Sequence, residues 1–259
     1  MFSHILLALA VSGQCLATHE TKGEGAKSLT TAEFKDAFRS SGIVPEILPA
    51  ALDPSVSFYA AYSSGDGKAA QIIPGSKLKV QEATFPVEFS VENLQNATNI
   101  TSSTRYLIYM LDADAPSRSD PSARNFRHYL GGNFTLTGTN SSVLSTAQLL
   151  SNRSQPFNDF VQPNPGPNTG EHRYILALYV QPPRYNTAGF ESAGMSDARM
   201  NWNLTQWRTQ LGLGPAIGAT YFTIETDPNA QSGAAAIGSS GMLSLLLGAV
   251  SLGSLMFLL

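Results

Sequence analysis

The chain has 259 residues, and its 16 basic and 19 acidic side chains give a formal net charge of −3 at pH 7. This mild negative charge argues against nucleic-acid binding, which requires a basic face. The single cysteine, Cys15, excludes a scaffold held by internal disulfides, so a hydrophobic core must stabilise one sizeable domain.

The first segment of the chain has the pattern of a secretory signal. Its apolar run at residues 5–11 is about seven residues long, far below the roughly 20 needed to span a bilayer. Cys15 and Ala17 place small residues at positions −3 and −1 of a cleavage site. We therefore expect residues 1–17 to be a signal peptide. The pattern is incomplete, because a signal peptide usually begins with basic residues and this segment has no Lys or Arg. The alternative is a buried N-terminal strand.

A polar segment and a first helix are predicted over residues 18–41. Thr30 and Glu33 have the spacing of a capping box, in which each side chain binds a free backbone amide of the other residue. Phe34 and Phe38 follow at i and i+4, so one face of this helix is apolar.

The rest of the pattern predicts a mainly β domain of the α+β class over residues 42–228. The prolines between residues 45 and 54 predict an extended loop. Aromatic and β-branched runs of strand length lie at residues 56–62, 86–91, 105–111, 126–136, 174–180 and 221–224. Asn203 is a candidate N-cap for a late, short helix. The sum is an antiparallel sheet with a few peripheral helices.

The last segment has the pattern of a glycosylphosphatidylinositol (GPI) attachment signal. Small residues at 232–234 precede a weakly polar spacer and an apolar run at residues 242–259 that contains no Lys or Arg. We expect residues 229–259 to be a linker and attachment signal whose tail is removed, with Ser232 as the attachment residue and Gly233 and Asn229 as the alternatives. A retained transmembrane tail is the alternative.

Six Asn-x-Ser/Thr sequons lie between the two ends, and together they favour passage through the secretory pathway. The predicted N-glycosylation sites are Asn96, Asn99, Asn133, Asn140, Asn152 and Asn203. We therefore expect the protein at the outer face of the plasma membrane or in the cell wall.

Four titratable residues lie at the ends of predicted strands. Asp112 and Asp114 directly follow an apolar strand, and His128 and His172 lie at the ends of two others. Buried carboxylates are costly unless they are hydrogen-bonded or paired. One interpretation is a shared pocket, since strand ends converge in β domains. The other is that each is an edge residue satisfied by its own surroundings.

The same residues carry a family resemblance. Residues 112–118, Asp-Ala-Asp-Ala-Pro-Ser-Arg, resemble the D-P-D-A-P-S-R signature of the phosphatidylethanolamine-binding proteins. Residues 128–130 resemble the H-W/F-L element that follows it, and residues 170–181 resemble the G-x-H-R-Y element that ends in Y-x-Q. Weaker likeness extends the resemblance over residues 42–225.

The resemblance implies a central antiparallel sheet, a second smaller sheet and an anion pocket at one end. It implies that Pro116 follows a cis peptide bond, which X-Pro sequences tolerate. The pocket residues that it implies are Asp112, Asp114, His128, His172 and Tyr174. Imidazole N–H groups donate to phosphate oxygens, and an aspartate can orient a histidine or receive an ammonium group. We therefore expect binding of phosphate-containing head groups such as phosphoethanolamine.

The chain departs from the family pattern at four positions. Ala113 replaces the first proline of the signature, which loosens that loop. Arg127 adds a charge beside the predicted pocket. Gln162 and Asn164 stand where the family usually has glycine, so the shape of the pocket wall, and with it the ligand, is open.

The sequence contains no motif that indicates catalysis. It has no Gly-x-Ser-x-Gly elbow and neither a His-x-x-x-His nor a His-Glu-x-x-His spacing. We expect a binding protein without enzyme activity, metal or cofactor. Its expected partners are a phospholipid head group or other small phosphate anion, and a membrane through the lipid anchor. The alternatives are an inhibitor of a serine protease or carboxypeptidase and a surface structural protein with a vestigial pocket.

Overall fold

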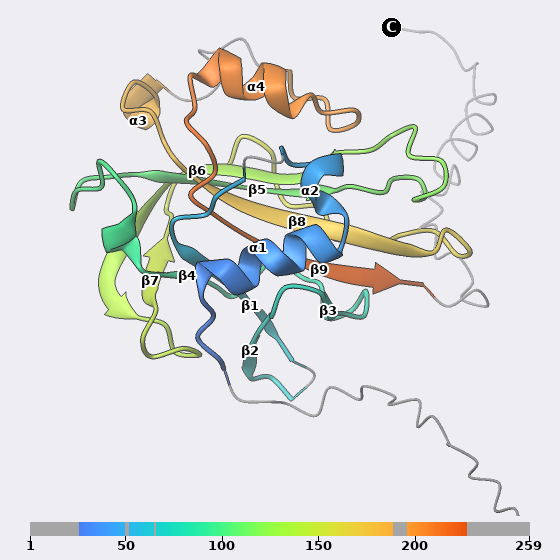
Figure 1. Ribbon diagram of the computed structural model, residues 1–259, viewed down its shortest axis with the longest axis horizontal. Helices are drawn as coiled ribbons and strands as arrows, with labels where there is room; N and C mark the ends of the chain where they lie inside the picture. The colour runs from blue at the N-terminus through green and yellow to red at the C-terminus, as the bar shows by residue number, and fades with distance from the viewer. Residues whose placement is uncertain (1–25, 50–51, 65, 189–195, 227–259) are drawn as a thin grey trace, which may run out of the picture.

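The structure is a computed structural model that describes residues 26–49, 52–64, 66–188 and 196–226. Within these residues, nine strands form one curled sheet in the order β2-β1-β4-β7-β6-β5-β8-β9-β3, with short helices at its periphery (Figure 1). The mainly β fold class is thereby confirmed. The predicted signal peptide and Ser232 lie outside the described residues. No helix in the described ranges has both the length and the apolar character to cross a membrane.

The described part of the chain contains the following strands and helices, in chain order. The strands are β1 (Ser57–Ser63), β2 (Ala69–Gln71), β3 (Ser76–Lys77), β4 (Glu88–Glu92), β5 (Tyr106–Asp112), β6 (Phe126–Asn140), β7 (Gln148–Ser151), β8 (Glu171–Val180) and β9 (Gly218–Glu225). The helices are α1 (Thr31–Ser40), α2 (Ile43–Glu46), α3 (Tyr185–Ala188) and α4 (Leu204–Leu211), with a 3-10 turn η1 (Leu94–Asn96).

The capping box predicted for the first helix is present. The Thr30 hydroxyl accepts a hydrogen bond from the Glu33 N–H at 3.2 Å, and the Glu33 carboxylate accepts one from the Thr30 N–H at 2.8 Å. The predicted extended loop after this helix is wrong at its start, where α2 forms. Val44 nevertheless keeps an extended backbone inside α2, because the ring of Pro45 excludes the helical conformation from the residue before it.

Strand β6 joins the two parts of the sheet. It pairs with β5 on one side and, further along, with β7 on the other. The parts β2-β1-β4-β7 and β5-β8-β9-β3 curl so that β1 and β9 come close, and the N–H of Val56 donates to the carbonyl of Ile217 at 2.9 Å. The predicted second, smaller sheet is therefore continuous with the central one through β6.

The two faces of β5 and β8 contact two separate hydrophobic clusters. One cluster lies between the sheet and the helices. It contains Tyr109 of β5, Phe34 of α1 and Trp207 of α4. The other fills the space between the two parts of the sheet and contains Tyr174 and Phe222, whose rings stack at 5.3 Å. Both strands are thus buried on both faces, and polar side chains at their ends border the second cluster.

Candidate functional site

The candidate site lies where β5 ends and β8 begins. Antiparallel pairing places Asp112 opposite Tyr174 of β8 and Phe126 of β6. His172 precedes Tyr174 by two residues, so their side chains lie on the same face of the sheet. Three neighbouring strands therefore converge on one position at the end of the sheet.

His128 joins the site through a β-bulge. The β5–β6 pairing passes from Met110–Tyr129 to Leu111–Arg127, so His128 is an extra residue without a partner in the ladder. Bulges redirect side chains in this way. The His128 ring contacts the edge of the Tyr174 ring, with 5.3 Å between the centroids.

Asp112 and His172 form a buried pair. Nδ1 of His172 lies 2.7 Å from Oδ2 of Asp112, and their side chains are 3% and 6% exposed. The other carboxylate oxygen, Oδ1, accepts the backbone N–H of Asp114 at 2.8 Å. Both carboxylate oxygens of Asp112 therefore form hydrogen bonds with groups of the protein itself, and Oδ2 fixes the orientation of the His172 imidazole.

The second nitrogen of His172 faces the loop before β8. Nε2 lies 3.0 Å from the Thr169 hydroxyl, which donates its own proton to the carbonyl of Gly166 at 2.7 Å. A hydroxyl has only one proton to donate, so Nε2 must donate to Thr169 while that bond to Gly166 is made. Both ring nitrogens of His172 are therefore engaged, Nδ1 with Asp112 and Nε2 with Thr169.

His128 has one free ring nitrogen. Its Nδ1 donates to the carbonyl of Val161 at 2.6 Å, and Nε2 has no hydrogen-bond partner among the described residues. Burial lowers the pKa of His128, while the Val161 carbonyl and the Asp112 charge partly oppose that shift. The imidazole is therefore mainly neutral at pH 7 and can take up a proton when an anion approaches.

Tyr174 lies at the centre of the group. Its ring stacks against His172 at 6.3 Å, and its side chain is almost fully buried. Burial raises the pKa of its phenol far above the ordinary value, and the charge of Asp112 and a hydrogen bond to it add to the shift. The phenol stays neutral, so it can act as a donor beside the two histidines, whose rings both contact the Tyr174 ring.

The backbone N–H of Asp114 binds Asp112, but the Asp114 carboxylate is engaged away from the other predicted ligands. Its carboxylate binds Arg173, through the backbone N–H at 2.9 Å, Nε at 2.8 Å and Nη2 at 2.6 Å. Arg173 also donates to the carbonyl of Ser41 at 2.9 Å and to Glu46 at 3.1 Å. Although burial opposes it, Asp114 and then Glu46 raise the pKa of Arg173. Asp114 is thus a structural residue that ties β5 and β8 to the α1–α2 connection.

Four of the five predicted ligands therefore lie together: Asp112, His128, His172 and Tyr174. The Ala115–Pro116 peptide bond is cis, which is the conformation that the resemblance implied for Pro116. Sequence reasoning missed Thr169. Its place three residues before His172, next to the Gly170 turn, is the signal that could have indicated it.

Two further observations concern metal binding and the exposure of the sequons. Within the described ranges, no group of three or more His, Cys, Asp or Glu residues is arranged to hold a metal ion. The exposed sequon residues are Asn96, Asn99, Asn140 and Asn203, and the half-buried ones are Asn133 and Asn152.

The sequence and the fold resemble those of known proteins. The model of the family described as phosphatidylethanolamine-binding protein matches residues 64–233. Protein MOTHER of FT and TFL1 homolog 2 of Oryza sativa subsp. japonica is 28% identical over 198 residues, which cover 76% of this chain and 97% of the relative. CEN-like protein 1 of Nicotiana tabacum is 26% identical over 181 residues, 69% of this chain and 86% of that protein.

Two solved structures share the fold. A carboxypeptidase Y inhibitor, solved in complex with its cognate proteinase, has a TM-score of 0.60 at 22% identity and covers 74% of this chain and 95% of its own. A phosphatidylethanolamine-binding protein from Plasmodium vivax has a TM-score of 0.55 at 17% identity, and the match covers 74% of this chain and 97% of that protein. At these identities the structures show the fold alone. The family match, the relatives and the motifs at residues 112–118 and 170–181 together establish that this chain belongs to the phosphatidylethanolamine-binding protein family.

Proposed function

We propose that the protein binds phosphate-containing head groups, such as phosphoethanolamine, at the site formed by Asp112, His128, His172 and Tyr174. The observation that carries the proposal is the pair of imidazoles that both contact the Tyr174 ring. One is held by Asp112 and the other has a free Nε2. Protonated imidazoles donate short, strong hydrogen bonds to phosphate oxygens.

The protein acts as a binding module rather than an enzyme in this proposal. The two histidines and the aspartate have no serine or cysteine bonded to them in the described ranges. A nucleophile within hydrogen-bond reach of its base is the mark of covalent catalysis. Thr169 is within reach of His172, but its proton is donated to Gly166. The geometry therefore favours holding an anion over activating a hydroxyl.

The proposed location is the cell exterior, with a lipid anchor. It is supported by the apolar run at residues 5–11, by the small and apolar residues from 232 onward, and by the six sequons. Treatment of intact cells with a phosphatidylinositol-specific phospholipase would test the anchor. We expect release of the protein into the medium, whereas a retained transmembrane tail would leave it with the cells.

Isothermal titration of the purified protein with phosphoethanolamine tests the binding site. The double variant His128→Ala, His172→Ala is expected to lose binding while the natural chain retains it. The matched control is Thr220→Val, which removes a buried hydroxyl that has no hydrogen-bond partner among the described residues. Equal affinity in the natural chain and the double variant would reject the site. A folded natural chain with no anion affinity would instead support the vestigial-pocket alternative.

Protease inhibition is a second candidate, favoured by the fold shared with the carboxypeptidase Y inhibitor. The test is inhibition of carboxypeptidase Y by the purified protein at increasing concentration. Inhibition that persists in the His128, His172 double variant would separate this function from head-group binding.

A further inference from the structure

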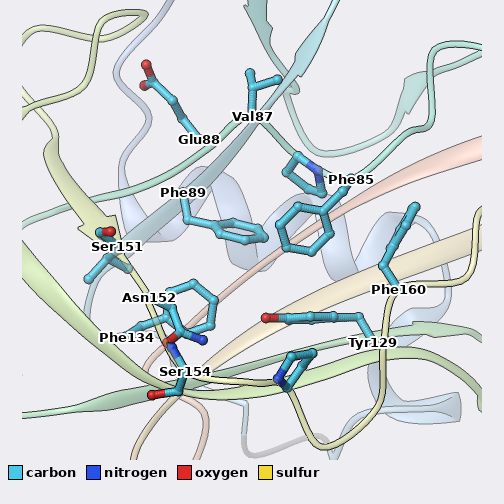
Figure 2. A pocket seen from close by; sticks show the side chains of 13 residues that line it. Phe85, Val87, Glu88, Phe89, Tyr129, Phe134, Ser151, Asn152, Ser154 and Phe160 are labelled. Atoms are coloured by element: carbon cyan, nitrogen blue, oxygen red, sulfur yellow. The ribbon is translucent and has the colours of Figure 1, made fainter.

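Apart from the head-group site, the structure has a hollow that is lined by Tyr129 and Phe160. It is a cavity of about 410 Å³, which we call the aromatic groove (Figure 2). Phe85 lies at its centre, and its ring contacts those of Tyr129 at 5.0 Å, Phe160 at 5.4 Å and Phe89 at 5.9 Å. Ser151, Asn152 and Ser154 line it as well.

The groove coincides with the main exposed apolar surface of the described chain. Phe85 is 40% exposed and Val87 52%, and both line the groove. Val161, 39% exposed, follows Phe160 directly. Only one other large apolar side chain of the described residues, Met200, is comparably exposed. A cluster of this kind marks a surface that something covers.

Asn152 is a sequon residue whose side chain faces this surface. Its Oδ1 accepts the backbone N–H of Ser154 at 2.6 Å, which fixes the orientation of the amide. Burial raises the pKa of the Tyr129 phenol to about 12, and a hydrogen bond from Asn152 lowers it in part. Asn152 and Tyr129 both line the groove, which places Nδ2, the atom that carries an N-linked sugar, at the wall of the groove (Figure 2).

The other sequons do not have this geometry. The oxygen of Asn133 accepts from Arg105 and Gln181, both at 2.9 Å. Asn140 donates its Nδ2 to the carbonyl of Ser145 at 2.6 Å. Asn203 caps α4. Of the six sequon residues, all of which are described, Asn152 alone lines the aromatic groove.

We propose that Asn152 carries an N-linked glycan whose first N-acetylglucosamine units pack into the aromatic groove and cover its exposed rings. The proposal rests on the proposed secretory route. A sugar ring suits this site because its C–H faces can lie against the aromatic rings. Its hydroxyl groups can meet Ser151 and Ser154 at the edge.

The covalent step is the ordinary transfer of an oligosaccharide from a lipid pyrophosphate donor by the host enzyme. The bond from sugar C1 to the pyrophosphate oxygen breaks, and a bond from C1 to Nδ2 of Asn152 forms. One proton leaves Nδ2, and the lipid pyrophosphate is the leaving group. Nδ2 keeps its second hydrogen after the transfer.

The experiment uses the full chain produced in a eukaryotic secretory host. Glycopeptide mass spectrometry gives the occupancy of each sequon, and peptide N-glycosidase treatment of the native protein gives the release rate at each site. We expect Asn152 to be occupied and its glycan to be released at least about tenfold more slowly than that of exposed Asn96, because the packed sugar must first leave the groove. After denaturation the two rates are expected to be similar.

Two matched variants test the covering role. Ser154→Ala removes the sequon but keeps Asn152 and its bond to the backbone N–H, and Asn96→Gln removes a glycan from an exposed position. Binding of Nile red, an uncharged apolar dye, is expected to rise in Ser154→Ala and to stay unchanged in Asn96→Gln. Ser154→Thr, which restores the sequon, is expected to return dye binding to the original level.

Several results would overturn the proposal. They are an unmodified Asn152 beside an occupied Asn96, equal native release rates, unchanged dye binding in Ser154→Ala, and an acyl lipid recovered in the groove of protein glycosylated at Asn152. Absence of glycans from every sequon would overturn the secretory route as well. Titration of the same preparations with phosphoethanolamine shows separately whether the head-group site holds, since the glycan and the histidines act at different places.

Discussion

Nδ1 of His172 lies 2.7 Å from Oδ2 of Asp112, and this pair is almost completely buried. The sequence left two roles open for Asp112, orienting a histidine or receiving an ammonium group. Because Oδ1 already accepts the Asp114 N–H, the geometry favours the first role. Asp112 is a positioning residue, and the ligand is recognised through its phosphate.

Asp112→Asn is expected to lower the affinity for inorganic phosphate and for phosphoethanolamine by the same factor. The amide keeps the shape of the side chain but loses the charge that pairs with the His172 imidazole, and a charge-assisted hydrogen bond is worth about 1.5–3 kcal/mol. Calorimetric titration should therefore show a loss of about ten- to a hundredfold for both anions. Loss of affinity for phosphoethanolamine alone would assign the ammonium-binding role to Asp112 and contradict this interpretation.

Thr169 competes with the ligand for His172 in this arrangement. Thr169→Val removes the hydroxyl that lies 3.0 Å from Nε2 and leaves that nitrogen free for phosphate. Phosphate affinity is expected to rise about three- to tenfold, since a net hydrogen bond contributes about 1 kcal/mol. Thr209→Val is the matched control, because its hydroxyl bonds only within α4, to the carbonyl of Thr205. A fall in affinity would show that the Thr169 hydroxyl itself contacts the ligand.

Asp114 is expected to matter for stability rather than for binding. Asp114→Ala leaves the buried guanidinium of Arg173 without its main partner, and such a loss costs about 3–5 kcal/mol of unfolding free energy. Urea denaturation measures this. The exposed pair of Asp36 and Arg39, with 3.8 Å between the charged atoms, gives the control: Asp36→Ala should change stability by less than about 0.5 kcal/mol. Similar effects of the two variants would show that the buried pair has no special role.

The lowered pKa of His128 predicts a pH dependence of folding. The folded state holds this proton less readily than the unfolded chain, whose histidine titrates near the ordinary value of 6.5. Below that pH the unfolded chain binds more protons, so the unfolding free energy falls as the pH decreases from about 6.5 toward 5. Lowered carboxyl pKa values, such as that of Glu46, act below this window. His128→Gln should flatten the profile between pH 5 and 6.5, and an unchanged slope would contradict the burial of this imidazole.

Local patterns predicted most of the fold. Some elements can be predicted from neighbouring residues alone. They are the Thr30–Glu33 capping box and the apolar strands at residues 105–111 and 174–180. Strand β7 and the short β2 and β3 have no such pattern, and they form because longer strands offer them free edges. The continuity of the sheet through β6 also depends on pairing between distant segments.

The site could be predicted in part for the same reason. Asp112, His128 and His172 each stand at a recognisable strand end, and their convergence follows from antiparallel pairing. Asp114 could not be assigned correctly, because its partner Arg173 is 59 residues away and only the three-dimensional register brings the two together. The aromatic groove was likewise invisible in the sequence, since Phe85, Tyr129 and Phe160 come from three separate segments.

Nuclear magnetic resonance of the histidine side chains, labelled with ¹⁵N, tests the central claim most directly. During titration with phosphoethanolamine, the ring signals of His128 and His172 are expected to shift together and to saturate at one equivalent of ligand. The single variants His128→Gln and His172→Gln assign the two signals. Ring signals that stay unchanged at saturating phosphoethanolamine, or binding that leaves one of the two histidines unaffected, would contradict a phosphate held between both imidazoles.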